Sequence, residues 1–349
     1  MKKEAIEKVL HNKVNGEELK ARLLASPEPR ITLSFYKYHH IGNPQVLRDH
    51  LFIMWNRRGV LGRIYVSFEG INAQLSVPEE HWEAFKSDLE TITFLQNIRL
   101  NIAVEDDGKS FFKLKVKVRK KIVADGLNDA SFDVTNIGTH LNAEEFNRVT
   151  DDQQAIVIDM RNHYESEVGH FEKAWCPDVD TFREALPLVL KQLEDKKERP
   201  IVMYCTGGIR CEKASAFLKH HDFKQVYQLE GGIIKYAQDA KAKGLKNKFI
   251  GKNFVFDERL GERISEEVIA HCHQCGALCD THVNCSNEAC NLLFIQCEEC
   301  AKRMEGCCSE ACVEVIHLPE EQRAEQRKHY DSGIRIFSKG RFKRLQTQE

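Results

Sequence analysis

Residues 201–218 have the sequence IVMYCTGGIRCEKASAFL, in which an apolar run precedes a glycine-containing turn and a segment with helical spacing. The apolar run Ile201–Tyr204 predicts a short buried strand, and the residues after the turn predict a helix. Cys205 is therefore expected between the end of a strand and the start of a helix. Gly207 and Gly208 allow this turn to bring its backbone N–H groups toward the sulfur atom.

The segment from Cys205 to Arg210 is a candidate active-site loop. The N-terminus of the predicted helix contributes positive potential, and Arg210 contributes a full charge. We expect this environment to lower the pKa of the Cys205 thiol and to hold a thiolate, or an anionic group carried on the sulfur. The loop residues that would support this anion are Thr206, Gly207, Gly208, Ile209 and Arg210. The alternative interpretation is a buried structural thiol in an ordinary turn.

The segments on both sides of this loop alternate between predicted strands and helices over residues 145–245. Ala155–Asp159 predicts a strand that ends in an acidic residue, and Val226–Leu229 predicts another strand. Such alternation is typical of a parallel sheet with helices on both faces, an α/β fold. Cys205 then lies at the carboxyl end of a central strand, where such sheets place their sites.

The pattern Cys-x-x-Gly-x-Arg resembles the active loop of rhodanese domains, in which the cysteine carries a persulfide. Asp159, Arg161 and the pair Gly169-His170 lie at matching offsets, and the resemblance implies that Asp159 and Arg161 support the loop. Cysteine-dependent phosphatases have a longer loop, whereas only four residues separate Cys205 from Arg210. This shorter loop suits a single sulfur better than a tetrahedral oxyanion, so thiolate or sulfur chemistry is favoured over phosphate hydrolysis.

The whole chain has 349 residues, 42% hydrophobic content and a formal net charge of −2, which fits two or three domains with real cores. The near-neutral charge does not by itself indicate a nucleic-acid partner. Because no apolar stretch reaches about 18 residues and the first residues lack an apolar core, neither a membrane span nor a signal peptide is expected. We expect a cytoplasmic protein whose thirteen cysteines are metal ligands or reactive thiols rather than disulfides.

Residues 1–130 predict a ferredoxin-like α+β domain. The predicted order βαββαβ comes from strands at 31–36, 62–67, 71–76 and 100–104 and from helices at 44–58 and 78–89. The second helix is expected to begin with Pro78. The first helix offers its apolar residues to the core, namely Leu47, Leu51, Ile53, Met54 and Trp55.

Another strand, with alternating lysines, follows at residues 112–123. The alternation predicts Leu114, Val116 and Val118 on one face and cations on the other. The candidate RNA-binding residues are Lys113, Lys115, Lys117 and Arg119, because a stripe of cations fits a phosphate backbone. A solvated strand face is the simpler alternative. Residues 131–144 are expected to form a linker to the α/β domain.

Ten of the thirteen cysteines lie after residue 270. Two Cys-x-x-Cys pairs can complete one tetrahedral zinc site, from Cys272, Cys275, Cys297 and Cys300. A second site can come from the remaining six, with Cys285, Cys290, Cys308 and Cys312 as candidates. An iron–sulfur cluster also accepts four thiolates, and reduced buried cysteines are the alternative without a metal. We expect residues 246–349 to be a metal-binding region with structural zinc, ending in a basic tail around Phe337 and Phe342.

The combination of these parts resembles the bacterial rhodanese-domain tRNA uridine hydroxylases over nearly the whole chain. The resemblance rests on Glu69-Gly70-Ile71-Asn72, the lysine-rich strand, the rhodanese core and the cysteine-rich end. It implies an enzyme that uses molecular oxygen as co-substrate to make 5-hydroxyuridine at the wobble position, with the tRNA anticodon stem-loop as partner and Cys205 as the essential cysteine. No Gly-x-Gly-x-x-Gly motif indicates a flavin or nicotinamide. Lys121 departs from the acidic residue expected at its position and makes the strand more basic.

Two other functions remain open from the residues alone. A rhodanese-type sulfurtransferase acting on tRNA or on a small acceptor needs the same Cys205 and Arg210. A non-enzymatic zinc-thiol protein that binds RNA needs neither of them. Cys211 is a second thiol beside the loop that could resolve an oxidised Cys205, although we favour simple packing within the helix.

Overall fold

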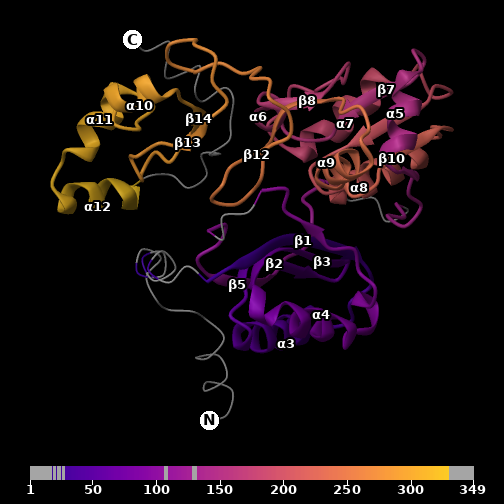
Figure 1. Ribbon diagram of the computed structural model, residues 1–349, viewed down its shortest axis with the longest axis horizontal. Coiled ribbons are helices and arrows are strands. Elements are labelled where there is room, and N and C mark those ends of the chain that lie inside the picture. The colour runs from indigo at the N-terminus through magenta and orange to yellow at the C-terminus, as the bar shows by residue number, and fades with distance from the viewer. Residues whose placement is uncertain are drawn as a thin grey trace.

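The computed structural model describes residues 28–105, 109–127 and 132–329, together with Glu18, Ala21 and Ala25. The predicted basic tail, with Arg335, Lys339, Arg341, Lys343 and Arg344, lies outside the described residues. An N-terminal sheet with its helices occupies the bottom of Figure 1, an α/β domain lies above it, and the cysteine-rich region lies beside the α/β domain. Among the described residues, no helix has the length and apolar character needed to span a membrane.

The N-terminal domain is a ferredoxin-like sandwich, which confirms the expected class. Its elements are β1 (Arg30–Tyr38), α3 (Pro44–Arg57), β2 (Leu61–Ser67), β3 (Gly70–Pro78), α4 (Trp82–Glu90), β4 (Asn101–Ile102) and β5 (Leu114–Val118). The strand order is β4-β1-β3-β2-β5, with β5 parallel to β2 and the other pairs antiparallel. Helices α3 and α4 pack on one face of this sheet, so that its other face turns toward the α/β domain (Figure 1).

Several details of this domain differ from the sequence-based expectation. Pro78 does not start a helix but ends β3, and a short 3₁₀ turn separates it from α4, which begins at Trp82. Ile53 is 40% exposed, because the buried face of α3 is rotated toward Phe52. Val118 is 39% exposed, unlike the two apolar residues before it on β5, because it is the last residue of an edge strand. The predicted strand at 100–104 is reduced to the two residues of β4.

The α/β domain has a four-stranded parallel sheet in the order β6-β10-β9-β7. These strands are β6 (Thr139–Leu141), β7 (Ile156–Asp159), β9 (Ile201–Tyr204) and β10 (Val226–Leu229). Along β9, Ile201 and Met203 join one core with α7 (Phe182–Gln192) and α8 (Ile209–His220), while Val202 and Tyr204 join another core with α5 (Ala143–Asp151) and α9 (Gly232–Lys243). The expected parallel sheet with helices on both faces is confirmed. Strand β6 lies within residues 131–144, so the expectation of a linker is wrong for these three residues. A strand of three residues is too short to show a sequence pattern.

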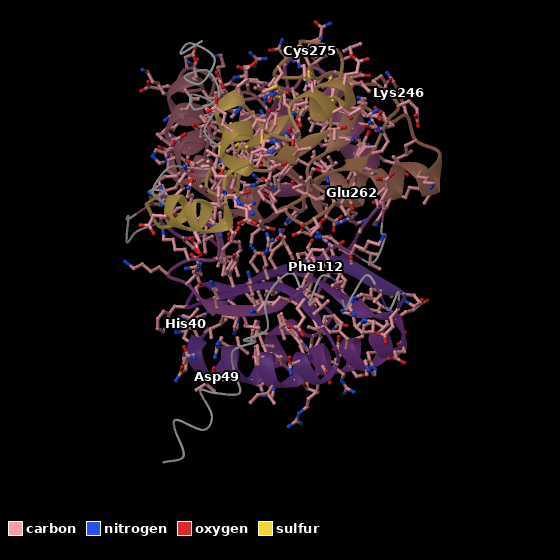
Figure 2. All side chains as sticks on the ribbon, turned by 90° about the vertical axis from the view of Figure 1, so that its left-hand side faces the viewer. His40, Asp49, Phe112, Lys246, Glu262 and Cys275 are labelled. Carbon is pink, nitrogen blue, oxygen red and sulfur yellow. The ribbon has the colours of Figure 1, made fainter. Side chains whose placement is uncertain are left out.

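The remaining elements belong partly to the α/β domain and partly to the residues that follow it, including the cysteine-rich region. They are α6 (His163–Ser166), β8 (Gly169–Phe171), β11 (Phe249–Asn253), β12 (Glu262–Arg263), β13 (His282–Asn284), β14 (Leu293–Ile295), α10 (Glu298–Arg303), α11 (Glu310–Ile316) and α12 (Glu320–His329). Strand β11 pairs with both β8 and β12. Side chains fill the boundary between the N-terminal sheet and the parts above it, where Phe112 and Glu262 lie, whereas Cys275 lies at the far end (Figure 2).

Candidate active site and metal centres

Cys205 follows β9 directly, and α8 begins four residues later at Ile209. The backbone N–H of Gly208 donates to Sγ of Cys205 at 3.1 Å. Gly208 has a φ of +102°, and a Cβ at this position would lie 2.7 Å from the hydroxyl of Tyr36. Both the left-handed turn and this close approach therefore require glycine. The loop curls around the sulfur as the sequence predicted.

The electrostatic surroundings of Cys205 favour its thiolate. Burial raises the pKa of the Cys205 thiol, but a hydrogen bond from the thiol of Cys211, the charge of Arg210 and the backbone N–H groups of both outweigh burial and lower this pKa to about 6. The pKa of Cys211 is raised by its own burial and by Cys205, so Cys211 keeps its proton. Cys205 is therefore mostly ionised at neutral pH, and Cys211 is its neutral partner.

We expect Cys205 to ionise with a midpoint near pH 6 in the folded protein. The thiolate fraction should rise with pH, because the folded surroundings stabilise the charged form. Ultraviolet thiolate absorbance is followed across pH for the wild type and for Cys205→Ser. The difference between the two curves measures this midpoint, because it removes the absorbance of the other cysteines. A rise in thiolate absorbance centred at about pH 8.5, the ordinary pKa of cysteine, would contradict the expectation.

Arg210 is held in place by a buried carboxylate that sequence reasoning did not assign to the site. Its Nη1 and Nη2 donate to the two carboxylate oxygens of Glu165 at 2.6 and 2.8 Å, and the Glu165 side chain is fully buried. Glu165 lies at the start of α6 and also accepts the backbone N–H of Asn162. The guanidinium carbon of Arg210 lies over the Phe256 ring, 5.8 Å from the centroid of that ring. Arg210 is thus fixed in orientation beside the loop.

Asp159 and Arg161 form a second buried ion pair at the end of β7. The guanidinium of Arg161 donates to both oxygens of Asp159 and, at 2.6 Å, to the carbonyl of Gly169 on β8. These bonds fix the end of β7 against β8. The supporting role that the resemblance implies for these two residues stays a prediction.

The free face of the N-terminal sheet covers the cysteine loop, which the sequence did not predict. Asn101 on β4 donates to the carbonyl of Gly207 at 3.4 Å, and the Tyr38 hydroxyl on β1 donates to the carbonyl of Ile209 at 3.3 Å. Because these contacts join residues more than 100 positions apart, no local pattern reveals them. They make the N-terminal sheet one wall of the candidate active site.

The basic stripe, Lys113, Lys115, Lys117 and Arg119, lies at the outer edge of this same sheet. The register places Lys117 beside Tyr65, Tyr65 beside Asn72 and Asn72 beside Tyr36. These three steps between strands span about 14 Å. Lys115 and Lys117 are exposed. Partial burial, followed by the positive charges of Arg63, Lys117 and Lys113, lowers the pKa of Lys115. Closely spaced cations therefore lie on the sheet face that also covers the loop.

A cleft of about 430 Å³ opens between the N-terminal sheet and the α/β domain. Its lining includes Tyr36, Arg99, Asn101, His140 and Glu212. Its volume lies within the range of ligand-binding clefts. Tyr36 and Asn101 also touch the cysteine loop, so the cleft adjoins the loop from the side of the N-terminal sheet.

Lys213 on α8 ties the α/β domain to two parts of the N-terminal region. Its buried ammonium group donates to both oxygens of Glu69, at 3.0 and 2.9 Å, and to Asp125 at 2.5 Å. Glu69 precedes β3, where Gly70 has a φ of +145° and a Cβ would lie 2.0 Å from the Lys37 carbonyl oxygen. The Glu69-Gly70 pair therefore has a defined role at the contact between the two domains.

Lys213→Met is expected to destabilise the chain by about 3 kcal/mol, because it leaves Glu69 without its cation and the buried carboxylate of Asp125 with Lys121 alone. Burial raises the pKa of Asp125, but hydrogen bonds from Lys121 and Lys213 lower it below its ordinary value. In the wild type the stabilisation from Asp125 is thus present above that ordinary value and is lost as pH falls through the folded pKa. In the variant, the loss of stability should shrink below about pH 4, where the carboxylates take up protons.

Urea unfolding followed by tryptophan fluorescence measures both effects. Lys219→Met is the matched control, because Lys219 lies on the same helix and its ammonium group donates to the carbonyl of Ile137 at 2.9 Å. Its expected cost is about 1 kcal/mol or less. Equal losses in the two variants would contradict the role given to Lys213.

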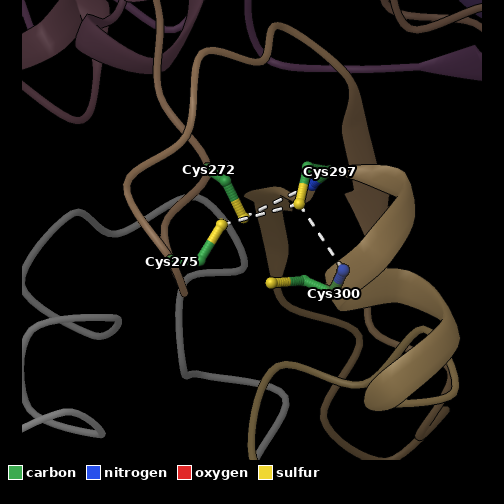
Figure 3. A group of neighbouring side chains, drawn as sticks. All are labelled: Cys272, Cys275, Cys297 and Cys300. Atoms are coloured by element: carbon green, nitrogen blue, oxygen red, sulfur yellow. Dashed lines mark hydrogen bonds between the residues drawn. The ribbon is translucent and has the colours of Figure 1, made fainter.

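Two groups of four cysteines are brought together in the cysteine-rich region. The first comprises Cys272, Cys275, Cys297 and Cys300, and the second comprises Cys285, Cys290, Cys308 and Cys312; within each group, all sulfur atoms lie within 4.8 Å of one another. Figure 3 shows the first group, with the two Cys-x-x-Cys pairs facing each other. Both groups match the sets predicted from the sequence.

The spacing within each group fits a tetrahedral metal site. The Sγ atoms of Cys275 and Cys297 are 3.6 Å apart, and Sγ of Cys308 is 3.7 Å from Cys290 and 3.8 Å from Cys312. A zinc ion with Zn–S bonds of about 2.3 Å requires neighbouring sulfurs about 3.8 Å apart. Backbone N–H groups also donate to the sulfur atoms. For example, the backbone N–H of Cys297 donates to Sγ of Cys272 at 3.3 Å. Four thiolates leave no open position, so such a site would be structural.

Comparisons with known proteins cover nearly the whole chain. Residues 142–239 match the family model described as a rhodanese-like domain, residues 30–122 match the UPF0176 acylphosphatase like domain, and residues 250–313 match the rhodanase C-terminal family. The chain is 57% identical over 334 residues to a protein of Pectobacterium carotovorum subsp. carotovorum named tRNA uridine(34) hydroxylase, covering 95% of this chain and 94% of the relative. A protein of the same name from Salmonella arizonae is also 57% identical, covering 95% of both chains, and one from Photorhabdus laumondii is 55% identical, covering 96% of both.

Proposed function

The chain belongs to the family of tRNA uridine(34) hydroxylases, and from this premise we propose that it converts the wobble uridine of tRNA to 5-hydroxyuridine, with molecular oxygen as co-substrate and Cys205 as nucleophile. The observation that carries the role of Cys205 is its lowered pKa within a glycine-containing loop beside a cleft. A tRNA substrate also favours the cytoplasm as the site of action.

Cys205 acts by adding its thiolate to C6 of the uracil ring, as soft nucleophiles do. The electron pair of the C5–C6 double bond then moves toward C5, which becomes nucleophilic and takes one oxygen atom from molecular oxygen. The second oxygen atom leaves as water, with two electrons from a reductant such as a thiol. Loss of the C5 proton restores the double bond and releases the Cys205 thiolate.

The anticodon loop supplies a target that this site can reach. A base must leave its stack before C6 can meet a sulfur atom that lies inside a domain, and this costs little in a single-stranded loop. The cleft beside the cysteine loop provides the space, and the basic stripe lies about 14 Å from Tyr36 along the sheet. The cations of the stripe contact phosphates of the anticodon arm.

The test of this function is incubation of the protein with unmodified tRNA, a thiol reductant and oxygen-18 gas, followed by mass spectrometry of the nucleosides. The expected product is a uridine with one labelled oxygen at position 34. Unlabelled oxygen in the product would contradict an oxygen-dependent reaction. A uridine that gains sulfur when a sulfur donor is added would instead support a sulfurtransferase.

The double variant Lys115→Glu/Lys117→Glu is expected to weaken tRNA binding by about tenfold or more at moderate salt, because it removes two cations that neutralise phosphates. The dependence of log K on log salt should become shallower by about 0.7–0.9 for each phosphate that is no longer neutralised. Filter binding across a salt series measures both. Lys191→Glu/Lys224→Glu makes the same charge change at two exposed positions of the α/β domain and should leave binding within about twofold. Equal effects of the two pairs would contradict a specific role for the stripe.

Each four-cysteine group holds one structural zinc ion in this proposal. The sulfur separations support zinc in both groups, and the second group lies in a small core that consists largely of cysteines, with Leu292 and Phe294. The metal would fix the loops and short helices of this region. It takes no part in the reaction at Cys205, because four thiolates close its coordination.

A further inference from the structure

Three polar side chains from separate segments form a continuous chain beside the cysteine loop. The Tyr36 hydroxyl on β1 donates to Oε1 of Glu212 on α8 at 2.9 Å, and Nε2 of His140 on β6 lies 3.1 Å from the same oxygen. The Tyr36 hydroxyl also lies where a Cβ of Gly208 would be only 2.7 Å away, so it touches the loop that holds Cys205. Neither the cysteine chemistry nor the fold explains why a carboxylate should lie here.

Of these three residues, Glu212 is the most buried and His140 is the most exposed. Tyr36 is partly buried, the Glu212 side chain is 12% exposed and the His140 side chain is 36% exposed. All three residues line the cleft between the domains. A proton that enters the chain at the Tyr36 hydroxyl can therefore reach solvent through His140.

The protonation states suit such a transfer. Burial, followed by the negative charges of Glu212 and Cys205, raises the pKa of Tyr36, so this hydroxyl keeps its proton at neutral pH. Burial raises the pKa of Glu212, but hydrogen bonds from His140, Gln228 and Tyr36 outweigh it and lower this pKa below its ordinary value. A neutral hydroxyl thus faces the loop, with an ionised carboxylate directly behind it.

The proposed reaction needs a proton carrier at this place. Hydroxylation at C5 ends only when the C5 proton leaves, because the C5–C6 double bond cannot otherwise re-form and expel Cys205. A group that touches the loop from the side of the cleft is placed to meet C5 of a base bound to Cys205 through C6. Tyr36 has this position.

We propose that Tyr36, Glu212 and His140 form a proton path that takes the C5 proton from the uracil bound to Cys205. The proposal rests on the proposed function and names further residues of that same site. As the C5–H bond breaks, its electron pair forms the C5–C6 double bond, and the pair of the C6–S bond returns to the sulfur. The Tyr36 oxygen receives the proton while its own proton passes to Glu212, then to His140 and solvent. In the reverse direction the path protonates C5 after the thiolate adds.

This reversibility gives a test that needs no oxygen. The wild-type protein is incubated anaerobically with tRNA that carries tritium at C5 of its uridines, and tritium released into water is measured. Addition of Cys205 at C6, protonation of C5 and reversal exchange the label without a net reaction. Tyr36→Phe is expected to slow this release at least tenfold. Glu212→Gln should do the same, because its amide oxygen keeps the hydrogen bond from Tyr36 but cannot take up a proton at neutral pH.

Tyr236→Phe is the matched control. Tyr236 lies on α9, outside the lining of the cleft, and its hydroxyl donates to Oδ1 of Asn147 and not to a carboxylate. It should release tritium within about threefold of the wild-type rate. Thiolate absorbance of Cys205 and the thermal midpoint, measured on every variant, show whether the loop is intact, and Glu212→Asp should restore part of the release by returning a proton acceptor.

The outcomes separate this inference from the proposed function. If the wild type makes labelled 5-hydroxyuridine while Tyr36→Phe and Glu212→Gln release tritium at the wild-type rate, the proton path is overturned and the function stands. A wild type that makes the product but releases no tritium without oxygen also overturns the path. If the wild type exchanges tritium but never incorporates oxygen, the path stands and the hydroxylase assignment fails.

Discussion

Cys205→Ser is expected to reduce the formation of 5-hydroxyuridine by about a thousandfold or more, to the level seen without protein. The wild-type surroundings bring the pKa of the thiol to about 6, so that a thiolate exists at neutral pH. The same hydrogen bonds cannot ionise a serine hydroxyl, whose ordinary pKa lies far higher. Serine fills almost the same volume in a loop where the residue is buried, so the loss should be chemical and not structural.

Single-turnover incubation with tRNA and mass spectrometry of the nucleosides measures this loss. Cys176→Ser is the matched control, because Cys176 is a partly buried thiol of the α/β domain that lies outside the cysteine loop and that the proposed reaction does not use. Burial, together with the charge of Asp159, raises the pKa of Cys176 to about 12, so that it stays protonated. This control should retain most of the activity. Product from Cys205→Ser above about a tenth of the wild-type amount would contradict nucleophilic catalysis by Cys205.

Local patterns predicted those parts of the molecule that are built from neighbouring residues. The run 201–218 has a strand, a turn and a helix in direct succession, and each leaves its own signature in a few residues. The two Cys-x-x-Cys pairs are local in the same sense, since a short turn brings two thiols to one side. Even the second cysteine group could be proposed, because its members lie within a span of fewer than 30 residues.

Contacts between distant segments left no such signature. The hydrogen bonds of Tyr36 to Glu212 and of Lys213 to Glu69 join residues that lie 176 and 144 positions apart. Each of these side chains alone has an ordinary surface interpretation, as a polar residue on the outer face of a strand or helix. Only the docking of the N-terminal sheet on the cysteine loop makes them part of one site.

The same limit explains the local misassignments. Ile53 fits the helical spacing of α3 as well as Phe52 does, and the choice between them depends on how the helix rotates against its sheet. Similarly, β6 has only three residues and is recognisable as a strand through its pairing with β10. A pattern in one segment cannot report the position of its partner.

Cys308→Ser is expected to remove one of two zinc ions. It should also unfold much of the region around the second cysteine group. Cys308 lies within 3.8 Å of two other sulfurs of its group, and its backbone N–H donates to Sγ of Cys285. The surrounding core has few apolar side chains apart from Leu292 and Phe294. A structural zinc ion contributes on the order of 10 kcal/mol to the folding of such small regions.

Elemental analysis and native mass spectrometry of the purified chain measure the zinc content, and limited proteolysis measures the folding of residues 282–318. The wild type should hold two zinc ions per chain, and Cys308→Ser should hold one and be cut in this region. Cys307→Ser is the matched control, because Cys307 is equally buried but belongs to neither four-cysteine group. It should keep both ions. A wild type without zinc, or a Cys308→Ser protein that keeps two ions, would contradict the assignment.

The effect on activity should differ between the two metal groups. In the first group, His273 lies between Cys272 and Cys275, and its Nε2 is 3.0 Å from the carboxylate of Glu167, two residues beyond the Glu165 that holds Arg210. Cys275→Ser should therefore disturb the cysteine loop through α6 and lower hydroxylation. Cys308→Ser, in the second group, should leave the pKa of Cys205 near 6 and retain more of the activity, because the metal acts only through the packing of its own region.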